Sequence, residues 1–268
     1  MPDLLNIFFK EPVAAYSNKL LTRPGESVFE AANRFNLFDF GEIRSKNKTM
    51  PLDKKWDQSQ EIKIKGPVEK VPPDVLKICN VFNNHNYQIF RNDDKNYNLN
   101  IVGLRNDNRE PNKFDDEIWV FWRFENKWTL KKYKATTDPG LTYLEDPLNS
   151  AGTAILKEGQ YIGAYRLGKH KGKYDALVQS KPVIVIRDFN RDNKLDFSSG
   201  KEQTGLFGIN IHRSSPTGES VFVNKWSAGC QVFANINEYN EFISLCKKSI
   251  GEWNNEFSYS LIRKTLVA

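Results

Sequence analysis

A histidine and a cysteine lie close together in the segment "GINIHRSSPTGESVFVNKWSAGCQVF", residues 208–233. The pattern predicts a strand that ends at His212, a polar loop, and a small-residue turn that leads through Cys230 into a second strand. If the two strands are neighbours, they bring His212 beside Cys230. A free thiol is mostly protonated near neutral pH, and an adjacent imidazole takes its proton or stabilises the thiolate. The segment therefore predicts a cysteine nucleophile with a histidine base.

The turn before the cysteine consists of Ser227, Ala228 and Gly229. Its small side chains leave room for a substrate carbonyl, and the amides of Gly229 and Cys230 are candidate donors to a developing oxyanion. Ser227 either orients the imidazole or forms a hydrogen bond within the turn. A structural interpretation competes with catalysis, because a cysteine before an apolar strand is often a small buried hydrophobe.

The residues "INIHR…KWSAGC" resemble the active-site segment of the YkuD-type L,D-transpeptidases, in which a histidine precedes a Ser/Thr-x-Gly-Cys turn. Residues 147–165, "PLNSAGTAILKEGQYIGAY", resemble the Pro-x-Gly-x-Tyr/Phe strand of that family. The resemblance implies that Cys230 is the acylated nucleophile and His212 its base. It also implies an L,D-transpeptidase-like fold and peptidoglycan as the substrate.

The chain departs from the family pattern on both sides of the cysteine. Ala228 replaces a frequent His or Arg, and Gln231 and Val232 replace an apolar residue followed by Arg. Without that arginine another cation must hold a substrate carboxylate, and the candidates are Arg213, Lys225 and Arg166.

Two further residues are candidates for substrate binding. His170, in "YRLGKHKGKYDAL", either lines the cleft or is an exposed loop residue. Trp226 directly precedes the Ser-Ala-Gly-Cys turn, where it either flanks a substrate groove or packs into the core.

The segment "RDFNRDNKLDF" has a spacing of oxygen ligands that resembles a calcium loop. Asn193 stands where glycine is usual, and asparagine tolerates a left-handed conformation. A solvated acidic turn without metal is the alternative. No cofactor is expected for catalysis, and the predicted structural calcium ligands are Asp188, Asn190, Asp192, the backbone carbonyl of Lys194, and Asp196.

The composition excludes several classes of protein. Lys and Arg total 39 against 33 for Asp and Glu, a net charge of +6 without a basic tail, so nucleic acid is not a favoured partner. Three scattered cysteines form neither a disulfide framework nor a zinc site. No apolar run reaches the roughly 20 residues of a membrane span. The N-terminus does not resemble a signal peptide. We therefore expect a protein made in the cytoplasm that acts in the periplasm or cell wall, or as part of a virion or secreted particle.

The chain divides in composition near residue 74. We expect residues 1–74 to be an accessory or docking segment and linker, and residues 75–268 to be the catalytic domain. Short strands between turn-rich loops predict a mainly β (α+β) fold with a few helices, and the resemblance implies a β-sandwich. Helices are expected near residues 27–35, from residue 74, and over 237–249; strands are expected over 61–65, 97–105, 159–167, 176–179, 182–188, 208–212, 231–233 and 259–267, with a hairpin around 125–127.

The predicted function is cysteine-dependent acyl transfer on peptidoglycan stem peptides through a thioester on Cys230. An amine would resolve the thioester in a transpeptidase, and water would do so in a peptidase or carboxypeptidase. The alternative is a non-enzymatic structural or cell-wall-binding component of a phage or injection particle that retains the fold. Residues 1–74 would then contact phage-tail or secretion-particle proteins.

Overall fold

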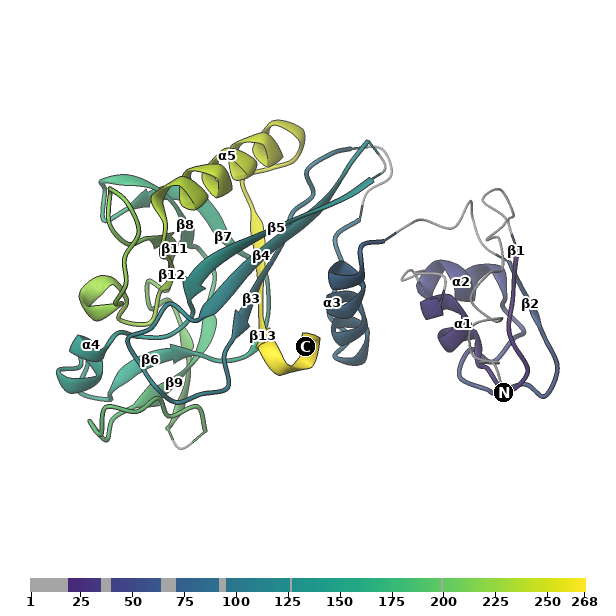
Figure 1. Cartoon of the computed structure of the whole chain (residues 1–268), viewed down its shortest axis with the longest axis horizontal. Helices are drawn as coiled ribbons and strands as arrows, with labels where there is room; N and C mark the ends of the chain where they lie inside the picture. The colour runs from purple at the N-terminus through teal and green to yellow at the C-terminus, as the bar shows by residue number, and fades with distance from the viewer. Residues whose placement is uncertain (1–18, 35–39, 64–70, 92–94, 126, 199) are drawn as a thin grey trace, which may run out of the picture. The chain divides into compact units, whose positions relative to one another are not determined.

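A computed structural model describes residues 19–34, 40–63, 71–91, 95–125, 127–198 and 200–268 of the chain (Figure 1). The chain forms two compact units, Met1–Asn84 and His85–Ala268. The third helix, α3 (Pro73–Asn84), belongs to the first unit, although we expected it to begin the second domain.

The first unit contains a small sheet with two helices. Strand β1 (Lys19–Leu21) pairs antiparallel with β2 (Glu61–Lys63), and the helices are α1 (Val28–Arg34) and α2 (Phe40–Lys46). Ser27 and Glu30 form a capping box at the start of α1, with hydrogen bonds of 2.7 Å and 3.1 Å between each backbone N–H and the other's side chain. The predicted helix start is confirmed, whereas Phe35 lies outside the described residues and α2 was not predicted.

Eight described strands of the second unit close into a barrel in the order β11-β12-β5-β4-β3-β13-β7-β8. The mainly β prediction is confirmed. The sandwich is not confirmed, because pairing of β11 with β8 closes the sheet on itself. The barrel strands are β3 (Asn100–Arg105), β4 (Asp116–Phe124), β5 (Lys127–Thr136), β7 (Gly159–His170), β8 (Tyr174–Gln179), β11 (Ile211–Arg213), β12 (Gln231–Phe233) and β13 (Phe257–Arg263).

A separate three-stranded sheet accompanies the barrel. Its order is β10-β9-β6, and both pairs are antiparallel. Neither β6 nor β10 was predicted as a separate strand; the sequence of β10, EQTG, has no apolar side chain to mark it. The bounds are β6 (Thr153–Leu156), β9 (Val183–Asp188) and β10 (Glu202–Gly205), and the remaining short elements are α4 (Leu141–Glu145), η2 (Asn224–Trp226) and η3 (Lys264–Val267).

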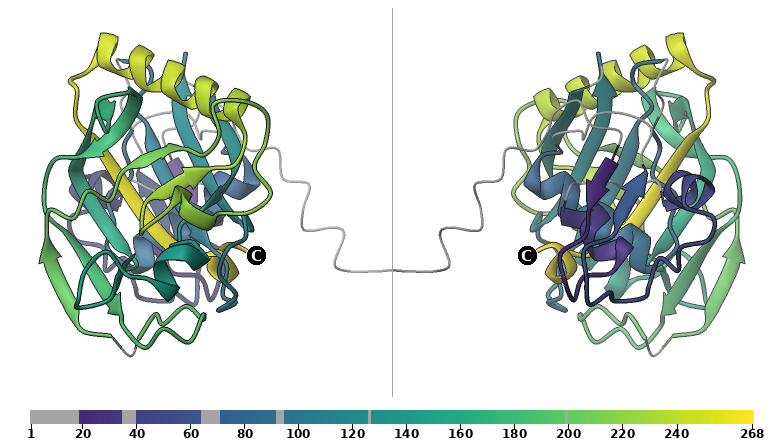
Figure 2. Two further views of the ribbon diagram at one scale, coloured as in Figure 1. Left: turned by 90° about the vertical axis from the view of Figure 1, so that its left-hand side faces the viewer. Right: turned by 90° about the vertical axis from the view of Figure 1, so that its right-hand side faces the viewer.

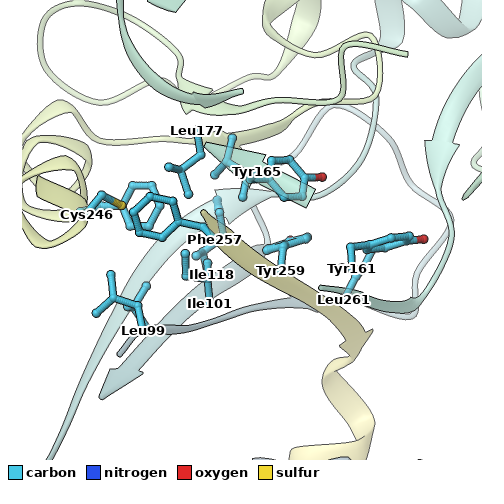
Figure 3. Close-up of a cluster of buried hydrophobic side chains, with 14 of the residues drawn as sticks. Leu99, Ile101, Ile118, Tyr161, Tyr165, Leu177, Cys246, Phe257, Tyr259 and Leu261 are labelled. Carbon is cyan, nitrogen blue, oxygen red and sulfur yellow. The ribbon is translucent and has the colours of Figure 1, made fainter. Parts of the chain in front are cut away.

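The closing helix α5 (Ile236–Glu252) covers one end of the barrel strands, as Figure 2 shows, and it contacts β5, β11 and β12. Asn235 caps it by accepting hydrogen bonds from the N–H groups of Asn237 and Glu238. Its apolar face, including Phe242 and Cys246, joins the main hydrophobic core (Figure 3). None of the helices in the described ranges is long and apolar enough to cross a membrane.

The register of two short strands positions the candidate site. Strands β11 and β12 are parallel, with His212 paired to Val232 and Arg213 to Phe233. Side chains alternate between the two faces of a strand. Ile211 and Phe233 enter the barrel core, so His212 and Val232 lie on the opposite face.

Candidate active site

Cys230 and His212 lie on the same face of neighbouring strands. Cys230 directly precedes β12 and lies opposite Asn210, because the N–H of Gln231 donates to the Asn210 carbonyl at 2.9 Å. The N–H of Asn210 also approaches the Cys230 Sγ at 3.4 Å. Since alternate residues share a face, Asn210, His212 and Cys230 all point to the same side. Asn210 is therefore the neighbour of the predicted nucleophile across the strand pair. The predicted base, His212, lies two residues further along β11 on the same face.

His212 has the tautomer that a general base needs. Its side chain is buried, and Nδ1 lies 2.7 Å from the Arg213 carbonyl oxygen and 3.2 Å from the Tyr174 hydroxyl. Because a carbonyl oxygen only accepts, Nδ1 carries the proton and Nε2 is the acceptor, for which we find no donor among the described residues. Burial, together with a smaller effect of the neighbouring His170, lowers the pKa of His212 to about 3. The imidazole is therefore neutral at physiological pH.

His170, at the end of β7, belongs to this site rather than to an exposed loop. It is buried, and its ring stacks on that of His212 with centroids 4.0 Å apart. Its Nδ1 accepts a hydrogen bond from the Asn210 side-chain amide at 3.1 Å. Burial lowers the pKa of His170 to about 4, and the positive charges of Lys171 and Arg213 act in the same direction. Two stacked neutral imidazoles thus fix the plane of the candidate base.

The Cys230 thiol is protonated in this arrangement. Its Sγ is half-buried and donates to the carbonyl oxygen of Gly208 at 3.4 Å. Burial raises the pKa of the Cys230 thiol to about 11, although the Asn210 N–H and the charge of Lys171 oppose this. Within the described residues no hydrogen bond joins Cys230 to His212. The site therefore holds a neutral thiol beside a neutral imidazole, without a preformed thiolate–imidazolium pair.

Ser227 stabilises the turn and does not orient the imidazole. Its Oγ accepts from the Gly229 N–H at 3.1 Å and donates to the Cys230 carbonyl at 2.8 Å. The Gly229 amide is consequently engaged, which corrects our interpretation that it binds an oxyanion. For the Cys230 amide we find no acceptor in the described part of the chain, so it remains the candidate donor.

Gly229 is required by its backbone conformation and by its surroundings. Its φ is +124°, and a Cβ there would lie 2.3 Å from the Ala154 carbonyl oxygen. The buried Gln231 also fixes this residue, because its Nε2 donates to the carbonyls of Gly229 at 3.2 Å and Thr137 at 3.3 Å. The Tyr259 hydroxyl in turn donates to Gln231 Oε1 at 2.8 Å. Gln231, which departs from the family pattern, therefore supports the cysteine turn.

The other residues that we predicted to bind substrate are not gathered around Cys230. Arg213 lies on the strand face opposite Cys230 by register, and its guanidinium stacks 4.1 Å from the centroid of the Tyr174 ring. Lys225 is exposed. Trp226 is half-buried and packs, as Cys230 does, against the cluster of Phe114, Val223, Val232 and Ala234. Packing is thus the role that the structure shows for Trp226.

The predicted calcium loop has the expected backbone but uses its oxygens internally. Asn193 has φ +60°, the left-handed conformation expected at a position where glycine is usual. The Asp188 Oδ2 accepts from the Asp196 N–H at 3.0 Å, and the Asp192 Oδ1 accepts from the Lys194 N–H at 2.9 Å. Asn190 Nδ2 donates to Asp196 Oδ2 at 2.7 Å.

The carboxylates of this loop do not converge on a common site. Asp196 pairs with the guanidinium of Arg109, while burial and the nearby Asp192 raise the pKa of Asp188 to about 6. Among the described residues no group of three or more His, Cys, Asp or Glu side chains is placed to hold a metal ion. Bound calcium therefore stays a prediction.

The structure adds three residues that we did not predict. Asn210 joins His170 to the Cys230 strand, Tyr174 contacts His212, and Arg187 lines a pocket beside the cysteine turn. Alternation in "GINIHR" is a signal that would place Asn210 on the His212 face, and Arg187 directly follows the apolar run "VIVI". Tyr174 gave no signal.

No family model matches the chain, and comparisons with curated proteins and with solved structures also find no match. Any assignment of function to this protein therefore depends on the geometry of its site.

Proposed function

We propose that the protein is a cysteine acyltransferase of L,D-transpeptidase-like type that acts on peptidoglycan stem peptides. One observation carries the proposal. The parallel pairing of β11 and β12 puts Cys230 and His212 on one face, and the Arg213 carbonyl holds the proton on His212 Nδ1. Nε2 is thereby left as a base on the face that carries the thiol.

In the proposed reaction the Cys230 sulfur attacks an amide carbonyl carbon while His212 Nε2 takes the thiol proton. The N–H of Cys230 donates to the oxyanion that develops. As the C–N bond breaks, His212 returns the proton to the leaving amine, and a thioester remains on Cys230. An incoming amine or water then gives its proton to His212 and attacks the thioester, and as the C–S bond breaks His212 passes that proton to the departing Cys230 sulfur. The first nucleophile gives cross-linking and the second gives hydrolysis.

This chemistry requires general-base catalysis at the moment of attack. Because the thiol is neutral and donates to Gly208, a bound substrate must turn Sγ away from that carbonyl and toward His212. The buried His170 ring keeps the imidazole in place while this happens.

A non-enzymatic wall-binding or phage-particle component is the second candidate. Two observations favour it: the thiol is held by the Gly208 carbonyl, and the Gly229 amide is engaged by Ser227. Such a protein would retain the barrel and bind peptidoglycan without forming a thioester.

Mass spectrometry of the protein incubated with purified stem peptides separates the two candidates. We expect the wild type to gain the mass of an acyl group on Cys230 and to release a cleaved or exchanged peptide. Cys230→Ala should do neither, whereas Cys246→Ala, which changes a buried thiol on α5, should behave as the wild type. Identical spectra for wild type and Cys230→Ala would exclude the enzyme.

We also propose that residues 1–74 form a docking segment for phage-tail or secretion-particle proteins, through which the protein reaches the cell wall. The separation of Met1–Asn84 as a compact unit with its own buried apolar residues supports this.

Calcium is proposed as a structural ion at Asp188–Asp196. If the loop binds it, melting should occur about 3 °C higher in calcium at roughly ten times its dissociation constant than in a chelator. Asp192→Asn should abolish the difference, because it removes a ligand charge from an exposed side chain. Equal melting temperatures in calcium and chelator for the wild type would argue for a metal-free turn.

A further inference from the structure

Arg187 on β9 is a buried cation without a carboxylate partner among the described residues. Its side chain donates from Nε to Gln203 Oε1 at 2.8 Å and from Nη1 to the Gly152 carbonyl at 3.1 Å. The residue is only 6% exposed, and burial lowers its pKa. For Nη2 we find no hydrogen-bond acceptor in those same ranges. A buried charge is costly unless it is paired, so the arrangement has a place for an anion.

This arginine lines a pocket of about 320 Å³. Leu148 and Leu206 contribute exposed apolar side chains to the wall, and Phe207 lies with its ring centroid 5.0 Å from the guanidinium carbon. None of its described lining residues is acidic. The pocket thus combines one desolvated positive charge with a lining that is apolar in part and includes the polar Asn149 and Thr153.

The pocket adjoins the Cys230 turn through two connections. Ala228, two residues before Cys230, lines it, and so does Phe207, whose neighbour Gly208 accepts the thiol hydrogen bond. Ala154 is the strand partner of Arg187, and its carbonyl is the group that a Cβ on Gly229 would meet. Two strand spacings of about 4.8 Å therefore separate the Arg187 backbone from the cysteine turn, a span of about three extended residues.

We infer that this pocket binds the free C-terminal carboxylate of the acyl-donor peptide, with Arg187 as its charged partner. The inference rests on the proposed function and narrows its substrate class to peptides whose scissile bond lies within a few residues of an unblocked C-terminus. The planar guanidinium suits a carboxylate, and its Nη2 supplies a donor. The apolar wall covers a small terminal side chain.

Arg187 fits this role better than the cations considered from the sequence. Arg213 donates to the Ser214 carbonyl at 3.2 Å and stacks on Tyr174, while Arg166 and Lys225 are exposed. A solvated cation binds a carboxylate weakly, whereas a desolvated one binds it more strongly.

The test measures binding separately from chemistry. Calorimetry on the Cys230→Ala protein compares a stem peptide that has a free C-terminal carboxylate with the same peptide as its C-terminal amide. We expect the acid to bind about tenfold or more tightly than the amide, as for a charge-assisted hydrogen bond. Arg187→Gln should remove this preference, and Arg166→Gln, the loss of an exposed arginine, should preserve it.

If the wild-type site binds the acid and the amide with equal affinity, the inference is wrong. It is also wrong if Arg187→Gln and Arg166→Gln reduce the preference for the acid equally. If Arg187→Gln does not fold, Ala228→Leu, which fills the pocket, replaces it: a retained acid preference overturns the inference. The two proposals fail separately. If a thioester forms but the acid peptide is not preferred over the amide, only the proposed carboxylate site is wrong. An Arg187-dependent preference without any thioester removes only the enzyme.

Discussion

Cys230 and Cys246 belong to the same unit, and burial raises the pKa of both thiols. Cys246 points from α5 into the main hydrophobic core, near Phe257 (Figure 3). Phe242 belongs to the same cluster of buried residues. Cys230 is half-buried at the start of a strand, on the face that carries His212.

The difference shows that a pKa shift alone does not identify a nucleophile. Both thiols are neutral near pH 7, but only Cys230 has a nearby histidine acceptor, a small-residue turn and an adjoining pocket. Cys246 has apolar neighbours and is fully buried. Access and a positioned base therefore separate the candidate catalytic cysteine from the structural one.

The largest expected effect comes from removing the base. His212→Ala should slow thioester formation by about 100- to 10,000-fold, because general acid–base catalysis contributes on that scale. His85→Ala, at an exposed histidine, should leave the rate unchanged. Single-turnover mass spectrometry measures both variants. If the two rates are equal, His212 is not the base.

Alkylation of the two thiols provides the next test. At pH 7 Cys230 should react with iodoacetamide more than about 100-fold more slowly than a free thiol, because a pKa near 11 leaves little thiolate. Its rate should rise about tenfold per pH unit beyond pH 9, where a free thiol levels off. Cys246 should react only on unfolding. Rapid alkylation of Cys230 at pH 7 would contradict the neutral-thiol description.

Two glycine substitutions compare the turn before Cys230 with the helix that carries Cys246. Gly229→Ala should destabilise the protein by about 3 kcal/mol or more, from a positive φ and the clash with Ala154. Gly251→Ala, in the last turn of α5 with nothing near its Cβ, should stabilise it by roughly 0.5 kcal/mol. Urea unfolding compares them, and equal effects would mean that the cysteine turn is unstrained.

Stability at mildly acidic pH gives the smallest effect. The folded-state pKa of His170 is lowered, so its contribution is fully present above the unfolded value near 6.5 and is lost as the pH falls toward 4. From pH 7.5 to pH 5 the free energy of unfolding should fall by about 2 kcal/mol more in the wild type than in His170→Gln. Urea unfolding at both pH values measures this difference. If the free energy of unfolding falls equally in both proteins, His170 accepts a proton in the folded protein as readily as in the unfolded one.

The strands that border the site were predictable because their residues follow strong local rules. Apolar residues in "QVF" and "VIVIRD", and the polar hairpin tip after Phe124, gave β12, β9 and the β4–β5 hairpin within a few residues. The closure of the barrel was not predictable, because it depends on a single pairing of Ile211 with Leu177, between segments distant in sequence.

The site was predictable where one segment contained it. The segment of residues 208–233 supplied His212, Cys230 and the turn. Contributions from β7, β8 and β9 were harder to see, because the stacking of His170 and the burial of Arg187 result from tertiary packing. The role of Ser227 depended on hydrogen-bond geometry within the turn.

The parallel pairing of β11 with β12 also determines which changes of chain length the site tolerates. The first part of the loop between these strands is anchored at two points, by hydrogen bonds from Ser214 N–H to the Phe233 carbonyl and from Ser220 N–H to the Ala234 carbonyl. Insertions between Pro216 and Thr217, which are exposed, change neither register, and longer loops cost little free energy. One residue added between Cys230 and β12 would turn the thiol to the other face. Lineages of such a protein are therefore free to vary the spacing from histidine to cysteine, but not the register within the two strands.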